Sequence, residues 1–331
     1  MRDMQDEWAS REMDPPIIEL VDEELWAIDL RFQGVPRVIA AWLLAGDGRL
    51  ALFDTGPAST LPALRAGIAA TGHRLEDLTD IVLSHIHLDH GGATGHLVAE
   101  AAGATVHVHP AGARHLVDPS RLWASAARIY GDRMEMLWGA MEPVPAERIR
   151  TPADGDTLDL AGRSLAVLHT PGHASHHIAL HDPARRMIFA GDTAGVRVPG
   201  TGYVCPPTPP PDLDPDLWHA TIARLAALDA RRLCLAHFGM VTDVAAHLGA
   251  LGRNLNCFRD LAVAALAAGA DGPELTARIS AAMAAGVAGG TPGVEPDPTV
   301  LAELEWATPA FMAAMGLTRY VTKAGLVASP A

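Results

Sequence analysis

The chain has 331 residues, 49% of them hydrophobic, so it is long enough to bury a substantial core. Acidic residues outnumber basic ones by 39 to 25, and the net charge of −14 argues against nucleic acid and anionic membranes as partners. The 3 cysteines are widely spaced, which fits neither a disulfide framework nor a CxxC zinc site.

The first segment, residues 1–16, is polar and acidic and is predicted to form an N-terminal tail. It has no apolar core of signal-peptide length. No apolar run in the sequence reaches the roughly twenty residues that a membrane span requires. We therefore expect a soluble, cytoplasmic protein.

Residues 17–54 contain four short apolar runs separated by turn residues, IIELV, LWAIDLRF, RVIAAWLLAG and RLALFD, which predict an antiparallel meander. Apolar residues at helical spacing follow in 60–71. A buried strand is then predicted at 80–84, a helix at 92–101 and another strand at 104–109. Strands and helices thus alternate in this part of the chain.

Residues 110–150 have an irregular, helical pattern and are predicted to be an insertion. The runs SLAVLH, HIALHD and RMIFAGD restore strands, and Asp214 and Pro215 then provide the cap and first residue of a helix. The last predicted strand is RLCLAH. These patterns predict two sheets covered by helices within 17–240, followed by a helical extension, 241–331.

Four of the strand-like runs end in side chains of the kind that bind metals, and a fifth run ends in Asp54. Strand ends can converge on one rim of a sheet sandwich, where residues distant in sequence become neighbours. Imidazole and carboxylate groups without a thiolate fit Zn²⁺, Fe or Mn in an open catalytic site. An ordinary polar loop would not explain why four strand ends match together. The candidate metal ligands are His85, His87, Asp89, His90, His173, Asp192 and His237.

These motifs resemble those of the metallo-β-lactamase superfamily, in the same order and over residues 17–240: HxHxDH, TPGH, GD and a final histidine after a strand. The resemblance implies an α+β fold, a four-layer αββα sandwich, here with a helical C-terminal extension. It also implies two divalent metal ions at the edge of the sandwich, with zinc favoured over iron or manganese. The family pattern would place His85, His87 and His173 on one metal, Asp89, His90 and His237 on the other, and Asp192 between both. Asp54 would orient ligands without binding a metal.

Three further residues, His177, Tyr203 and Cys205, are candidates for lining the substrate pocket. For His177, as for His169 and His176, a neutral, hydrogen-bonded state is the favoured alternative. Tyr203 and Cys205 lie at the start of a proline-rich segment, 205–215, that is predicted to be a rim loop or partial lid. Both residues fit the role of a packed loop anchor equally well.

The predicted activity is hydrolysis by a hydroxide shared between two metals, with Asp89 and Asp192 as catalytic residues. Within the family, the bridging Asp192 points away from the β-lactamases, and an ester or lactone of small size is the preferred substrate. The alternatives are a thioester or phosphoester hydrolase, a mononuclear-iron persulfide dioxygenase or diiron reductase, and a metal-binding scaffold. The small-residue helices of the extension are expected to form a homodimer.

Overall fold

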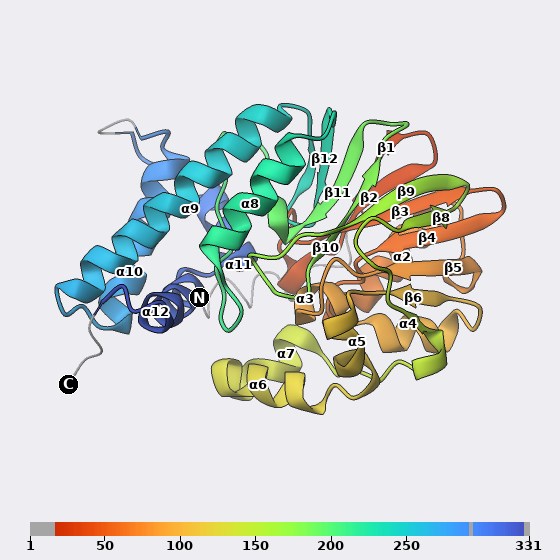
Figure 1. Ribbon diagram of the computed structural model, residues 1–331. Coiled ribbons are helices and arrows are strands. Elements are labelled where there is room, and N and C mark those ends of the chain that lie inside the picture. The colour runs from red at the N-terminus through yellow and green to blue at the C-terminus, as the bar shows by residue number, and fades with distance from the viewer. Residues whose placement is uncertain (1–16, 291–293, 328–331) are drawn as a thin grey trace.

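Two stacked sheets with helices on both outer faces make up the fold (Figure 1). The computed structural model describes residues 17–290 and 294–327, so the predicted N-terminal tail, 1–16, lies outside the described residues. The predicted α+β, four-layer αββα sandwich is confirmed.

The first sheet has seven strands in sequence order, β1 to β7. Strands β1 to β4 pair antiparallel, as the meander prediction requires, whereas β4 to β7 pair in parallel. The parallel half matters for the site, because the carboxyl ends of β4, β5 and β6 point the same way. The strands are Ile18–Asp22, Leu25–Asp29, Ala40–Gly46, Arg49–Phe53, Leu78–Val82, Thr105–His107 and Ile149–Arg150.

The second sheet has six strands in the order β13-β12-β11-β10-β9-β8. Strands β8 to β11 pair antiparallel, and β12 then pairs in parallel with β11 after a crossover through α8 (Pro215–Ala226). The edge strand β13 was not predicted, because three residues carry no readable pattern. The strands are Thr157–Leu160, Arg163–His169, Ile178–Asp182, Met187–Gly191, Arg232–Leu235 and Gly239–Val241.

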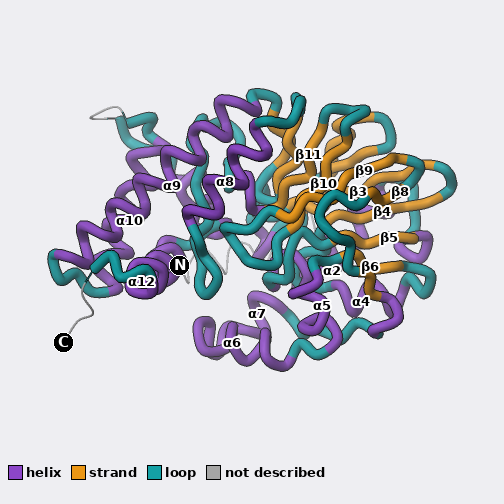
Figure 2. Tube along the Cα trace, in the orientation of Figure 1, coloured by secondary structure: helices purple, strands orange, loops and turns teal. Residues whose placement is uncertain are grey.

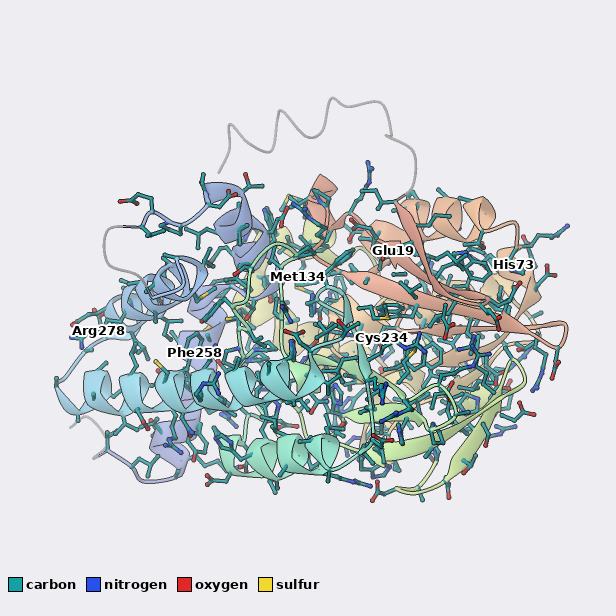
Figure 3. The ribbon with its side chains drawn as sticks, turned by 90° about the horizontal axis from the view of Figure 1, so that it is seen from above. Glu19, His73, Met134, Cys234, Phe258 and Arg278 are labelled. Atoms are coloured by element: carbon teal, nitrogen blue, oxygen red, sulfur yellow. The ribbon has the colours of Figure 1, made fainter. Side chains whose placement is uncertain are left out.

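Alternation along the strands divides the apolar side chains between the layers. In β3, Leu43 faces the helices, whereas Trp42 and Leu44 face the second sheet. The layer between the sheets includes Cys234 (Figure 3). It also contains a stacked pair, Phe53 and Phe189, with ring centroids 4.0 Å apart. This close packing fixes the two sheets relative to each other.

The outer face of the first sheet is covered by helices from the N-terminal half and from the predicted insertion (Figure 1). Met134 and Trp138 of that insertion are buried in this layer, while Met136 is 43% exposed. The helices are α2 (Leu61–Ala70), α3 (Leu88–Gly91), α4 (Thr94–Glu100), α5 (Pro110–Val117), α6 (Ser120–Tyr130) and α7 (Met134–Trp138).

The C-terminal helices stand beside the second sheet, and the long helix α9 runs next to α8 (Figure 2). They share one apolar core with α8 and the outer face of that sheet, and Phe258 of α9 is fully inside it (Figure 3). The domain boundary predicted at residue 241 stays a prediction. Within the described residues, none of the helices is both long enough and apolar enough to cross a bilayer. The helices are α9 (Val244–Ala267), α10 (Gly272–Val287), α11 (Pro298–Ala307) and α12 (Ala310–Lys323).

Candidate metal centre

The seven predicted ligands meet at one edge of the sandwich, where strands from both sheets end. His85 follows β5 and His173 follows β9, while Asp192 and His237 follow β11 and β12. Each of these residues lies shortly past the last residue of its strand and is itself buried, so its polar side chain needs partners within the site. The fold therefore brings together the residues that the sequence motifs singled out.

One group of donors consists of His85, His87 and His173. His85 Nε2 lies 2.8 Å from His87 Nδ1, and His173 Nε2 lies 3.3 and 3.2 Å from these two atoms. The histidines at 85 and 87 come from the same loop after the first sheet, whereas the third comes from the second sheet. All three present a ring nitrogen to one point.

The other group consists of Asp89, His90 and His237. The Nε2 atoms of the two histidines are 3.3 Å apart, and each lies 3.6 Å from Asp89 Oδ2. Asp192 stands between the groups: its Oδ1 is 3.3 Å from His90 Nε2, and its Oδ2 is 3.3 Å from His173 Nε2. One carboxylate thus has an oxygen facing each group.

The spacing of these donors fits divalent cations. Zn–N bonds are about 2.0–2.1 Å long, so two ligands at a tetrahedral centre are about 3.3–3.4 Å apart. Three of the six separations within the two groups, and both distances from Asp192 given above, are 3.2–3.3 Å, while the others are 2.8 and 3.6 Å. In addition, Asp192 Oδ1 is buried and has no polar neighbour among the described residues except ring nitrogens of the centre, His90 Nε2 at 3.3 Å and His237 Nε2 at 3.4 Å. A buried carboxylate oxygen is stable only with a partner, and a cation bound here would be that partner.

The far nitrogen of three imidazoles is held by a group that accepts a hydrogen bond. His173 Nδ1 lies 2.9 Å from the carbonyl oxygen of Pro207, and His237 Nδ1 lies 2.6 Å from that of Val38. Carbonyl oxygens only accept, so Nδ1 carries the proton and the Nε2 lone pair is free toward the centre. His90 is oriented in the same way by a carboxylate, that of Asp54, at 2.9 Å.

Asp54 also organises the loop that carries the ligands. Its carboxylate accepts hydrogen bonds from the backbone N–H and the hydroxyl of Ser84, both at 2.7 Å. The same hydroxyl lies 3.0 Å from His85 Nδ1, so Asp54 reaches one histidine of each group. The predicted orienting role of Asp54 has a geometric basis, and Ser84 is an intermediary that the sequence reasoning missed.

The electrostatics of the centre depend on burial and on the mixture of histidines and carboxylates. Burial and the neighbouring imidazoles lower the pKa of His85 and His87 well below the usual value. Burial also opposes a charge on His90, but the carboxylates of Asp192, Asp89 and Asp54 outweigh it and raise its pKa well above the usual value. Burial would raise the pKa of Asp192, yet the surrounding histidines lower it well below its ordinary range. The carboxylates of the centre thus stabilise positive charge at the position of His90.

The centre is accessible to solvent on the side of His87 and Asp89, since most of the other donors are fully buried. His176 stands on this side, with its ring 5.6 Å from that of His87 and its Nδ1 buried without a partner. Burial lowers the pKa of His176 to about 4, so it is neutral at physiological pH. Its position suits contact with a bound substrate better than that of His177.

The three candidate pocket residues follow the alternatives given for them, a hydrogen-bonded histidine and a packed loop anchor, and do not line an open pocket. His177 is fully buried, where Nδ1 lies 2.7 Å from the hydroxyl of Thr170 and Nε2 accepts a hydrogen bond from the backbone N–H of Asp192. It therefore holds the backbone of Asp192 from the buried side of the centre. Cys205 is also buried, and the Tyr203 hydroxyl contacts its sulfur within the core shared with the C-terminal helices.

A family model described as the metallo-β-lactamase superfamily matches residues 34–237, more than half of the chain. The chain belongs to the metallo-β-lactamase superfamily. The matched region begins in the meander and ends at the last predicted ligand. Members of this superfamily are usually metal-dependent hydrolases, and the gathered histidines and carboxylates provide the donors for metals.

Solved structures support this fold. The metallo-β-lactamase family protein TTHA1429 from Thermus thermophilus is 22% identical with a TM-score of 0.66, and the alignment covers 92% of this chain and 95% of that one. A β-lactamase domain protein from Burkholderia ambifaria is 18% identical with a TM-score of 0.61, covering 96% and 92%. Because 92% and 96% of this chain is covered, both alignments extend over most of the C-terminal helical segment.

Two sequence relatives extend the comparison, and one of them is named for an activity. The metallo-β-lactamase fold-containing protein ST1585 from Sulfurisphaera tokodaii is 26% identical over 210 residues, 62% of this chain and 75% of its own. A hydroxyacylglutathione hydrolase from Fuscovulum blasticum is 32% identical over 194 residues, 58% of this chain and 59% of its own. The match to the second relative spans less than two thirds of that enzyme.

Proposed function

We propose that the chain is a hydrolase that uses two divalent cations to cleave an ester, lactone or related acyl bond of a small molecule. His85, His87 and His173 would hold one cation, and Asp89, His90 and His237 the other. The observation that carries the proposal is the position of Asp192, which turns one oxygen toward each group of donors. A carboxylate in that position is suited to bridge two ions, with zinc favoured for this donor set.

A pair of bound cations lowers the pKa of water toward about 7 and polarises the oxygen of the bond to be cleaved. The protein's own contribution is to fix the donors and to handle the proton. Asp89 is the carboxylate of the centre with the largest exposed fraction, 24% of its side chain, so it can reach both water and substrate. In the proposed reaction it would accept the proton of the attacking water and deliver it to the leaving oxygen.

Substitution of Asp192 tests the proposal directly. Asp192→Asn should abolish hydrolysis and lower the metal content of the purified protein together, because the amide cannot bridge two cations. Asp182→Asn is the matched control: Asp182 is also buried, in the second sheet, but its carboxylate accepts a hydrogen bond from the backbone N–H of Arg185 and does not contact the centre. Metal analysis and a panel of aryl esters, lactones, thioesters and phosphodiesters give the readout. A metal-free, fully active Asp192→Asn variant would refute the proposal.

A thioester is the second candidate for the substrate. It is favoured by the similarity to two hydroxyacylglutathione hydrolases, which are 32% and 31% identical to this chain over 194 and 188 residues. The same panel decides between oxygen esters and thioesters by their relative kcat/KM. One iron per chain with oxygen uptake would point instead to the redox alternative on the same ligands.

A further inference from the structure

We propose that helices α11 and α12 position the metal ligands from a distance, by holding the two loops whose carbonyl groups orient His173 and His237. The inference rests on the proposed metal centre. It assigns the C-terminal extension a role in building the centre, in addition to covering the second sheet.

The first connection runs from α12 to His173 through the proline-rich loop. Gly316 of α12 packs directly against the backbone of Thr208, and a Cβ at this glycine would overlap the Thr208 carbonyl oxygen. The preceding residue, Pro207, supplies the carbonyl that accepts the hydrogen bond from His173 Nδ1 at 2.9 Å. Contact with the helix therefore fixes the chain one residue from the orienting carbonyl.

A second contact holds the same loop farther along. Arg319 lies one helical turn after Gly316 and donates a hydrogen bond from Nε to the carbonyl oxygen of Pro211 at 3.1 Å. Helix α12 thus binds the loop at two points. Because Arg319 is exposed, it can be replaced without opening a hole in the core.

The other connection runs from α11 to His237. Glu303 of α11 is 1% exposed and forms an ion pair with Arg37, which belongs to the loop between β2 and β3. The backbone N–H of Arg37 donates to Asp29 at 2.8 Å, so this residue is held at both its main chain and its side chain. Its neighbour Val38 supplies the carbonyl that accepts from His237 Nδ1 at 2.6 Å.

Orientation matters because a neutral imidazole has one proton and two nitrogens. While the carbonyl is in place, the proton stays on Nδ1 and Nε2 offers a lone pair to the cation. If the loop shifts, the ring can rotate or carry its proton on Nε2. A protein molecule with the ring in either of these states must rearrange it before the ring can bind a metal. Loss of such orienting groups typically costs about 10- to 100-fold in metal affinity.

The two connections lead to different cations. His173 belongs to the group with His85 and His87, whereas His237 belongs to the group with Asp89 and His90. A change in α12 should therefore weaken one ion, and a change in α11 the other. A general loss of stability would affect both ions alike, so this selectivity distinguishes positioning from simple structural damage.

The test uses the full-length chain and two pairs of variants. Gly316→Ala pushes α12 away from the loop, and Gly252→Ala is its control, because a Cβ at Gly252 in α9 meets only ordinary contacts. Glu303→Leu removes the partner of Arg37 while filling the space. Its control, Glu274→Leu, removes an exposed ion pair on α10. Zn²⁺ titration of the metal-free proteins and ¹⁵N NMR of the histidine rings give the readouts.

Gly316→Ala is expected to weaken one zinc site by about 10- to 100-fold and to perturb the ring signals of His173 before metal is added. Glu303→Leu should do the same to the other zinc site and to His237, and both controls should match the wild type. If Gly316→Ala does not fold, Arg319→Met tests the same connection with a smaller expected loss. Wild-type zinc affinities and ring signals in all variants would overturn the inference. A wild-type protein that binds no zinc would instead overturn the proposed function.

Discussion

Replacement of Asp54 by asparagine is a sharp test of how the centre is organised. The carboxylate accepts three hydrogen bonds: two from Ser84 at 2.7 Å and one from His90 Nδ1 at 2.9 Å. Asparagine has the same shape, and it tolerates the left-handed backbone conformation at this position, where φ is 56°. The variant should therefore fold while the pattern of donors and acceptors changes.

Neither orientation of the new amide reproduces the original contacts. With its NH₂ toward His90, two donors face each other unless the ring moves its proton to Nε2, the atom that faces the centre. With its NH₂ toward the backbone N–H of Ser84, that half-buried N–H loses its acceptor. We expect zinc affinity at the site of His90 to fall by about 10- to 100-fold, or about 1.4–2.8 kcal/mol.

Calorimetric titration of the metal-free protein with Zn²⁺ measures this loss. Asp80→Asn is the control, because Asp80 also pairs with a histidine, His107, at 2.8 Å, but outside both groups of donors. The control should bind zinc like the wild type. If Asp54→Asn binds both ions with wild-type affinity, the ring proton of His90 does not govern binding and the reasoning fails.

Three further predictions concern metal loading, a helix cap and a titrating histidine. A chelator should lower the thermal midpoint of the metal-loaded protein, since an ion at 100 times its Kd stabilises the folded state by about 2.7 kcal/mol; an unchanged midpoint would show that no stabilising ion is bound. Asp214→Ala should cost about 1 kcal/mol in urea unfolding, because the carboxylate caps α8 by accepting from two backbone N–H groups, and Asp216→Ala, which removes no such cap, serves for comparison. Burial and His169 lower the pKa of His109 to about 4, and its neutral ring accepts from the backbone N–H of Ala111. Its contribution to stability should thus be complete above pH 6.5 and decline as the pH falls toward about 4, and an NMR midpoint near 6.5 would contradict this.

The sequence was sufficient to predict the main elements that build the site. The meander, the alternation of strands and helices and the cap of α8 at Asp214 all depend on local patterns, and the structure confirms them. The residues proposed as ligands could be found because several separate apolar runs each end in a histidine or an aspartate, a coincidence that a shared site accounts for. The structure brings them together, whereas metal binding itself stays a prediction, as does the homodimer.

The remaining features depend on contacts that leave no local pattern. The carbonyl groups of Val38 and Pro207 orient two histidines, but every residue has a carbonyl, so composition cannot identify them. His177, shortly after the TPGH motif, was a candidate for the substrate pocket, with a neutral, hydrogen-bonded ring as the favoured alternative, and the structure shows the hydrogen-bonded ring. In the structure the chain turns into β10 at that point, so the ring lies beneath Asp192 rather than in the open. Tertiary packing determines both which carbonyl groups orient the histidines and where the ring of His177 lies.

The two sheets contribute to both groups of donors, and this arrangement has a mechanical consequence. A cation bound by His85, His87 and His173 would cross-link the loop after β5 to the loop after β9, and the other would join the first sheet to β12 through His237. The ions would cross-link the two sheets at one end of the sandwich. Loaded protein should therefore resist forces that peel the sheets apart at that edge, while the opposite edge opens as easily as it does without metal.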